Sequence, residues 1–399
     1  MISFEPSEDQ RMMADQARAF ARSLRLRMRE AEAAREVPAD LRKTAIEMGL
    51  GSVAIPESLG GAGLGLATAS LIEQELAAGD VGAAFGLPGP GAFGRAVAEL
   101  ADTAQAIHAL SLIAEDGFGA VAWGERAPHP TRPGLRAIAR REGDDWVLSG
   151  QKAYVLNAGR ASAFVVFAQV DESLGWAGLG AFLVASDAPG VQVGPRETTL
   201  GLDVASVADV TFNDVRVKAS ERLGEGANFE AATLRFFVKN ALIMASRAVG
   251  LSRAAVDVTR DYVEQRKAFG KPVGHFQAVA FNVADRAMDV AASSAMVLRA
   301  AWMWDAAVPE QEALLASAFA VSFALEAAMR CGDDAVQLHG GAGFIRDYPV
   351  EKMMRDAKQL QLAGMPSGCA DQLAAAVELG RPLDLGLVLP NAESQSALV

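Results

Sequence analysis

The sequence predicts a mainly α protein in which a central β-domain separates an N-terminal helical domain from a C-terminal four-helix bundle. Apolar residues recur every three or four positions up to about residue 113, which is typical of amphipathic helices. The period becomes two between about residues 119 and 218, as strands require, and longer helical segments follow from about residue 229. At 399 residues the chain exceeds the ~250–300 at which single cores stop growing, so several packed domains are expected.

We place the domain boundaries where the pattern changes. The helical domain is expected over residues 1–117, the β-domain over 118–226, the bundle over 227–385 and a loose tail over 386–399. Within the helical domain, Gly and Pro concentrate at residues 56–65 and 86–91, which predicts loops between helices.

The β-domain and the bundle each carry a further pattern. In the β-domain, residues 135–155 alternate around a turn at 142–145, and residues 164–170 and 180–184 are strand-like. Residues 207–217 are expected to form a hairpin that turns at Asn213 and Asp214. Four long helices are predicted for the bundle. They span residues 229–266, 277–307, 310–336 and a last segment from 350 through the 370s.

Composition excludes several classes of function. The net charge of −12 argues against nucleic acid or an anionic membrane as the main partner. No run approaches ~20 uninterrupted apolar residues, so no membrane span is expected, and the first residues lack the features of a signal peptide. Cys331 and Cys369 do not make a disulfide framework, which favours a reduced, cytoplasmic protein. No pair of histidines has metal-ligand spacing, so no metal site is predicted.

Several motifs follow one another in an order that resembles the acyl-CoA dehydrogenase family over nearly the whole chain. The stretches are VAIPESLGGAGLG at 53–65, WVLSGQKAYVLNAG at 146–159, VADVTFNDVRV at 207–217, YVEQRKAFGKPVGHFQAV at 262–279 and the segment 335–368. The resemblance implies FAD as cofactor, an acyl-CoA thioester as substrate and an electron-accepting flavoprotein as partner. It also implies a carboxylate that removes the α-proton while the flavin takes a hydride from the β-carbon.

In this family the ADP half of FAD is bound largely by the neighbouring subunit. The matching residues here are Arg266, Phe269, Gln277, Gln337, Gly340 and Gly341. An arginine offers a fixed fork of donors to a pyrophosphate, and glycines let the backbone approach it closely. The alternative interpretation is that the glycines only join two helices, Arg266 is a solvated helix residue and Phe269 belongs to the core.

The positions that contact the flavin ring are less well preserved. The hydroxyl side chains of the family are replaced, although backbone N–H groups could still donate. Tyr154 keeps an aromatic ring that could cover the flavin, here called an aromatic plate, and Trp123 could add a second one. The aligned residues are Gly124, Glu125, Arg126, Pro130, Tyr154, Val155 and Leu156.

The two positions that hold the catalytic carboxylate in the family hold none here. One corresponds to Gly364, and the other falls at Asn240 or an immediate neighbour on the first bundle helix. We therefore assign no catalytic residue. Glu125 is expected to be structural, and His339 is expected to make a polar contact rather than to transfer a proton.

Two functions remain open. In the first, the chain is a subunit without its own catalytic carboxylate that completes the FAD site of a homologous partner in a heterotetramer. In the second, it is a self-sufficient FAD enzyme of the family, a homo-oligomer with an unusual base or substrate. The first is favoured, because the residues that serve a neighbour's FAD survive while those that serve its own flavin ring have changed.

Overall fold

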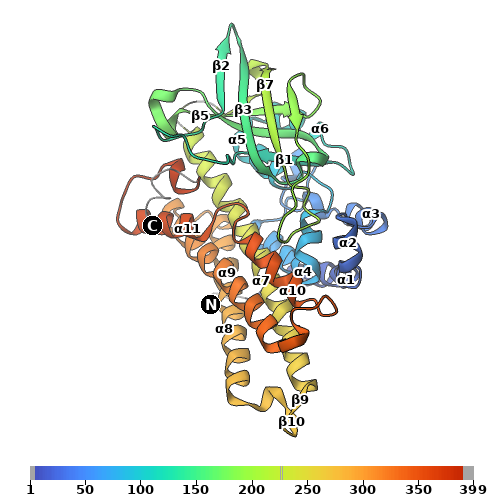
Figure 1. Cartoon of the computed structure of the whole chain (residues 1–399). Coiled ribbons are helices and arrows are strands. Elements are labelled where there is room, and N and C mark those ends of the chain that lie inside the picture. Colours follow the sequence, from blue (N-terminus) through green and yellow to red (C-terminus); the bar gives the residue numbers. More distant parts are fainter. Residues whose placement is uncertain (1–4, 225, 227, 390–399) are drawn as a thin grey trace.

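The structure is a computed structural model that describes residues 5–224, 226 and 228–389 (Figure 1). Its N-terminal part is helical, as predicted. The helix α4 packs against both α1 and the first helix of the bundle, so it lies at the centre of this part. The helices are α1 (Glu8–Leu26), α2 (Met28–Ala34), α3 (Ala39–Glu47), α4 (Leu66–Phe85), α5 (Gly91–Leu100) and α6 (Thr103–Ser111).

The middle part is a sheet with its own core, as the period of two predicted. Strand order is β6-β7-β3-β2-β4-β5-β8, and β1 pairs in parallel with β4. One face of β4 packs on β7 through the edge-to-face pair Phe164 and Phe212, whose rings lie 6.4 Å apart. The strands are β1 (Phe118–Ala122), β2 (Ile138–Glu142), β3 (Asp145–Val155), β4 (Ala161–Gln169), β5 (Leu179–Ala185), β6 (Val191–Val193), β7 (Ala208–Val217) and β8 (Arg222–Leu223).

The hairpin predicted at Asn213 and Asp214 is wrong, because β7 runs through both residues as a single strand. Its register against β3 shifts between Leu148 and Gly150, where one extra residue of β7 is accommodated as a bulge. Asp214 takes the positive φ of 49° that the bulge requires, and its carboxylate accepts a hydrogen bond from Ser149 Oγ at 2.6 Å. The turn-like dipeptide therefore marks a bulge, since Asp tolerates the left-handed region there.

The C-terminal part is the predicted bundle, with one correction. The expected fourth helix is two helices, because Gly364 adopts φ +90° and Pro366 caps the second of them. Neither residue suits a helix interior. The hairpin strands β9 and β10 form the far tip of the bundle, opposite the sheet in Figure 1. The elements are α7 (Phe229–Gln265), β9 (Lys267–Ala268), β10 (Lys271–Pro272), α8 (Gln277–Asp305), α9 (Glu310–His339), α10 (Val350–Leu360) and α11 (Ser367–Glu378).

One helical segment of the described chain, Glu310–Ala342, is long and apolar enough to cross a bilayer, which the sequence did not lead us to expect. Of its most apolar window, 61% is buried within the fold. It packs against α7, α8, α10 and α11, so its apolar faces are those of a central bundle helix. At the end of the described chain, Val388 and Leu389 are buried, and residues 390–399 of the predicted tail lie outside the described residues.

Candidate cofactor and substrate site

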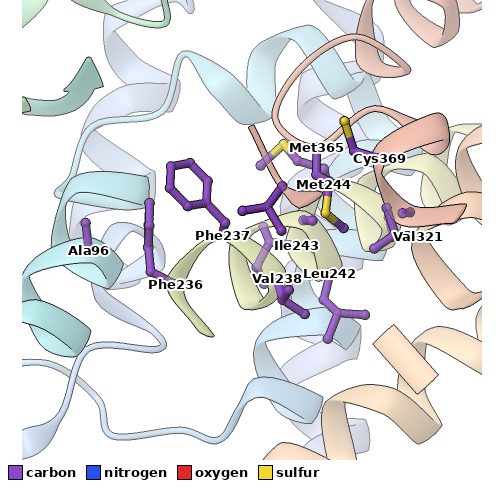
Figure 2. Packing of buried hydrophobic residues seen from close by; sticks show 14 of the residues in the cluster. Ala96, Phe236, Phe237, Val238, Leu242, Ile243, Met244, Val321, Met365 and Cys369 are labelled. Atoms are coloured by element: carbon purple, nitrogen blue, oxygen red, sulfur yellow. The ribbon is translucent and has the colours of Figure 1, made fainter. Parts of the chain in front are cut away.

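A cavity of about 700 Å³ lies where the three parts of the chain meet. This volume is within the range of ~300–1,000 Å³ that small-molecule sites occupy. Its walls come from α4, α5, α7, β1, the end of β3 and the loop between α10 and α11. Figure 2 shows the packed side chains of α7 that reach this region, with Phe237, Ile243 and Met244 on the helix and Met365 from the loop.

The two aromatic plates that the sequence singled out both line this cavity. Trp123 packs edge-on against Phe237, with ring centres 5.6 Å apart. Tyr154 lies more openly, 57% exposed, with φ +54°. The guanidinium of Arg126 stacks 4.8 Å above the ring of Tyr154 and donates to its hydroxyl at 2.9 Å. Arg126 is anchored in turn by Asp209 and Glu197, so a salt-bridged network holds the plate in place.

The two positions that the resemblance led us to expect for a catalytic carboxylate, Gly364 and Asn240, also line the cavity. Gly364 lies in the α10–α11 loop, where an added Cβ would meet Met244 Cγ at 3.4 Å. Asn240 lies on α7, and its carboxamide oxygen accepts two hydrogen bonds from Arg95, at 2.8 and 3.2 Å. Neither side chain can remove a proton from a substrate.

The carboxylates that do line the cavity, in the part of the chain that the structure describes, are Glu73 and Glu125. Glu73 accepts two hydrogen bonds from Arg247, at 2.7 and 3.0 Å. Glu125 accepts from buried Lys152 at 2.8 Å, and its oxygens also cap the N–H groups of Arg136 and Ala137. Both carboxylates are engaged in ion pairs that stabilise the fold, the structural role expected for Glu125 from the sequence. Neither is free to act as a base.

The residues predicted for the ADP half of FAD gather at the other end of the bundle. The side chain of Arg266 makes no hydrogen bond or ion pair with a described residue, and Phe269 is 96% exposed at the turn of the β9–β10 hairpin. The interpretation of Phe269 as a core residue is therefore wrong. All six are exposed: Arg266, Phe269, Gln277, Gln337, Gly340 and Gly341.

The end of α9 is open enough for a diphosphate. Gly340 ends the helix with φ +57°, a conformation that suits glycine. A Cβ added at Gly340 or Gly341 would meet no atom within 4 Å, so a ligand can approach the backbone there. These glycines and the free guanidinium of Arg266 fit the diphosphate of FAD.

His339, which precedes the glycines, is buried rather than presented to a ligand. Its ring stacks on Tyr262 at 4.2 Å, and its Nδ1 donates to the carbonyl of Ala335 at 2.7 Å. Burial lowers the pKa of His339, so the ring is neutral at physiological pH. A neutral ring inside the end of the bundle has a packing role, which agrees with the expectation that it does not transfer protons.

The two parts of the site are far apart within one chain. Arg266 follows Phe237 by 29 residues on the continuous helix α7. At about 1.5 Å per residue, some 44 Å separates Arg266 from Phe237, against which Trp123 packs, and roughly 28 Å separates it from Arg247, the nearest lining residue of α7. One FAD molecule cannot span that length, so Arg266 and the cavity of the same chain cannot hold the same FAD.

The described residues offer no metal site and no reactive thiol. No group of three His, Cys, Asp or Glu side chains within them could hold a metal ion. Cys331 and Cys369 are free and buried, and burial raises the pKa of their thiols to about 12 and about 11. Both thiols are therefore protonated at neutral pH.

Sequence reasoning missed the charged group formed by Glu73, Arg95 and Arg247. Each lies on a different helix of the cavity wall, in a mostly apolar stretch such as GAFGRAVAEL around Arg95. A lone charge within an apolar helical run was the available signal, because such a residue needs a partner or a ligand once it is buried.

Three family models match the chain in order. They are the acyl-CoA dehydrogenase N-terminal domain at residues 7–116, the middle domain at 129–215 and the C-terminal domain at 229–369. A probable acyl-CoA dehydrogenase, FadE25 of Mycobacterium tuberculosis, is 34% identical over 321 residues, which cover 79% of this chain and 80% of the relative. The probable acyl-CoA dehydrogenase YngJ of Bacillus subtilis is 30% identical over 371 residues, covering 90% and 95%. Among solved structures, butyryl-CoA dehydrogenase from Megasphaera elsdenii superposes with a TM-score of 0.87 at 27% identity, over 95% of this chain and all of that one.

Proposed function

The chain belongs to the acyl-CoA dehydrogenase family, whose cofactor is FAD, and we propose that it works there as a subunit without a catalytic carboxylate of its own. It would complete the FAD site of a homologous, catalytically complete subunit. The activity of the assembly is the α,β-dehydrogenation of an acyl-CoA thioester.

The first support for this proposal is the separation of the two parts of the site, which requires a second subunit for any FAD bound at Arg266. Arg266, Phe269 and the glycines after α9 are exposed, and Arg266 lies roughly 28 Å along α7 from the nearest cavity-lining residue of that helix. Exposed side chains with no role in their own fold are suited to contact another subunit. The pair Arg266 and Gly341 would hold the diphosphate of a FAD whose flavin ring lies in the partner.

The second support comes from the cavity itself. FAD supplies the hydride acceptor of this chemistry, and the protein must supply a base at hydrogen-bonding reach of the α-proton. Gly364 and Asn240 occupy the two positions of that base, and Glu73 and Glu125 are ion-paired elsewhere. The described residues of the cavity would thus orient and enclose a ligand, and none of them is placed to take its proton.

The partners follow from the family. The assembly would take an acyl-CoA substrate and pass electrons to an electron-accepting flavoprotein. A heterotetramer with a homologous subunit is the expected state, and the two protonated thiols fit a reducing, cytoplasmic location.

A second candidate is a self-sufficient FAD enzyme with an unusual base or substrate. The cavity favours it, since it keeps about 700 Å³ and two aromatic plates, Trp123 and Tyr154. In that case a homo-oligomer would place Arg266 of one copy against the flavin of another.

Purification of the chain alone, and together with a co-encoded homologue that carries the glutamate, separates the two candidates. The measurements are FAD per chain and acyl-CoA-dependent dye reduction. For the chain alone we expect low flavin content and no turnover. For the mixed complex we expect bound flavin and turnover. Full flavin occupancy with turnover by the chain alone would exclude the partner-subunit function and favour the second candidate.

A further inference from the structure

The cavity holds a positive charge that the protein does not neutralise. In the described part of the chain its charged lining residues are Glu73, Arg95, Glu125, Arg247 and Lys358. Glu73 pairs with Arg247, Glu125 pairs with Lys152, and Lys358 is exposed at the surface. Arg95, partly buried in the cavity wall, has no carboxylate of a described residue bound to it.

The only side chain that Arg95 contacts by hydrogen bonding, among the described residues, is the carboxamide of Asn240. Nε and Nη2 of Arg95 both donate to Asn240 Oδ1, at 3.2 and 2.8 Å. Because a guanidinium only donates, the oxygen of the carboxamide must face it, and the Nδ2 group must point elsewhere. The orientation of Asn240 is thereby fixed.

This arrangement leaves a set of donors with no acceptor. Arg95 Nη1 and Asn240 Nδ2 make no hydrogen bond to a described residue, and neither atom is sealed off by protein. Both residues line the cavity. An acceptor that reached them would meet N–H groups from two side chains, one of them charged.

The free-energy cost of burying the charge of Arg95 also indicates a ligand of opposite charge. Burial lowers the pKa of Arg95 to about 10, against the attraction of nearby Glu73, so the group stays protonated at neutral pH. A buried charge without a counter-ion destabilises a fold. Such a group is typical of a binding site whose ligand brings the opposite charge.

We propose that Arg95 and Asn240 form a binding site for the carboxylate of an apolar ligand that fills the cavity. A planar carboxylate matches the fork of a guanidinium, and the remaining walls are apolar, with Phe236, Phe237 and Ile243 among them. Two sources share this chemistry: a free aliphatic or aromatic acid, and the distal carboxylate of a dicarboxylic acyl-CoA. The second source rests on the proposed function.

Calorimetric titration of the full chain with hexanoate and with hexanamide tests the site itself. The two probes have the same shape, and only hexanoate carries the charge. We expect hexanoate to bind at least about tenfold more tightly than hexanamide, since hydrogen bonds to charged groups are the stronger class. Equal affinities, or no binding of hexanoate, would overturn the proposal.

Two variants tie the preference to these residues. Arg95→Met should abolish the preference for hexanoate while leaving the melting temperature unchanged or raised, because it removes an unpaired buried charge. Asn240→Asp should do the same by neutralising Arg95 in place, so the test survives if one variant does not fold. Arg247→Met, by contrast, removes a paired charge: it leaves Glu73 without its partner and should lower the melting temperature. A preference that persists in Arg95→Met and Asn240→Asp would contradict the assignment.

Titration with adipoyl-CoA and with hexanoyl-CoA identifies the source of the bound carboxylate. An Arg95-dependent preference for adipoyl-CoA would support the site with an acyl thioester as ligand. A preference confined to hexanoate would support the site with a free acid as ligand. Failure of both thioesters to bind the chain or its complex counts against an acyl-CoA in this cavity, and the hexanoate titration still decides the carboxylate site. The proposal would be overturned if neither pair of probes, the free acid with its amide or the two thioesters, showed a preference that depends on Arg95.

Discussion

The hydroxyl of Tyr262 donates a hydrogen bond to the carbonyl oxygen of His339 at 3.1 Å, and the two rings stack at 4.2 Å. Tyr262 lies on the last turns of α7, and His339 is the last residue of α9. Through this contact the sequence around Arg266 and the glycines at 340 and 341 come to the same end of the bundle. The proposed binding residues for the ADP half of FAD are therefore assembled by a contact that contributes no ligand atom itself.

Replacement of Tyr262 by Phe should weaken this junction. It removes one donor to a carbonyl oxygen and keeps the stacked ring, so the free energy of unfolding should fall by about 0.5–1.5 kcal/mol in urea denaturation. Tyr348→Phe is the control, because the Tyr348 ring also lies against His339 but its hydroxyl makes no hydrogen bond with a described residue. Equal losses in the two variants would show that the Tyr262 hydroxyl contributes nothing specific.

Lys352 should be the most sensitive charged residue in the junction of the three parts. Its Nζ lies 2.7 Å from Asp80 on α4 and 2.6 Å from Asp356, and Asp356 also accepts the N–H of Leu202. Lys352→Met would leave two carboxylates buried without a cation, so we expect a loss of about 3–5 kcal/mol in the free energy of unfolding. Lys43→Met, at an exposed pair with Glu47, should change it by less than about 1 kcal/mol. A comparable effect in both variants would contradict this account of the junction.

Glu75 should make stability depend on acidic pH. Burial opposes its ionisation, but hydrogen bonds from Arg18 and Arg253 outweigh burial and lower the pKa of Glu75 below its ordinary value near 4.5. A depressed carboxylate pKa gives stability that is present above the unfolded-state value and is lost as pH falls through the folded-state value. Glu75→Gln should therefore lose about 1–3 kcal/mol at pH 7 and show a flatter loss of stability between pH 5 and pH 3, by urea denaturation at each pH. Parallel curves for the variant and the wild type would refute the linkage.

Gly364 should resist substitution, because its backbone has φ +90°. Any residue with a Cβ is strained there, so Gly364→Ala should lower the free energy of unfolding by roughly 1–3 kcal/mol. Gly368→Ala, four residues on, has open space for its Cβ and a helical position, so it should be neutral or slightly stabilising. The same strain would act on Gly364→Glu, so that variant is not expected to regain a well-placed base. A stable Gly364→Ala would contradict this reading of the loop.

Periodicity alone predicts most of the fold. The helices near 229–265, 277–305 and 310–339 and the strands of the sheet follow from patterns of three to four and of two, because burial of one face sets those patterns. The failures have local causes. A Gly and a Pro broke the last helix, and an Asn–Asp pair that suggested a turn became a bulge.

The candidate site, like the fold, could be predicted from the sequence only in part. Arg266, Gln337 and the glycines could be proposed from sequence because each lies in a short motif, and the structure shows that they are exposed. The pairing of Arg95 with Asn240 joins residues 145 positions apart, and no local pattern encodes such a contact. Phe269 is ambiguous by sequence, since an apolar residue can serve either a core or an exposed contact surface.

The most direct test of the partner-subunit function is Arg266→Ala introduced only in this chain, in complex with an unaltered homologous subunit that carries the glutamate. The measurement is FAD per complex. We expect a clear loss of flavin, although the subunit that holds the flavin ring is unchanged. Arg260→Ala, on the same helix but ion-paired with Asp257 and Asp261, should leave flavin content as in the wild type. Unchanged flavin in the Arg266→Ala complex would contradict the claim that this chain completes its partner's FAD site.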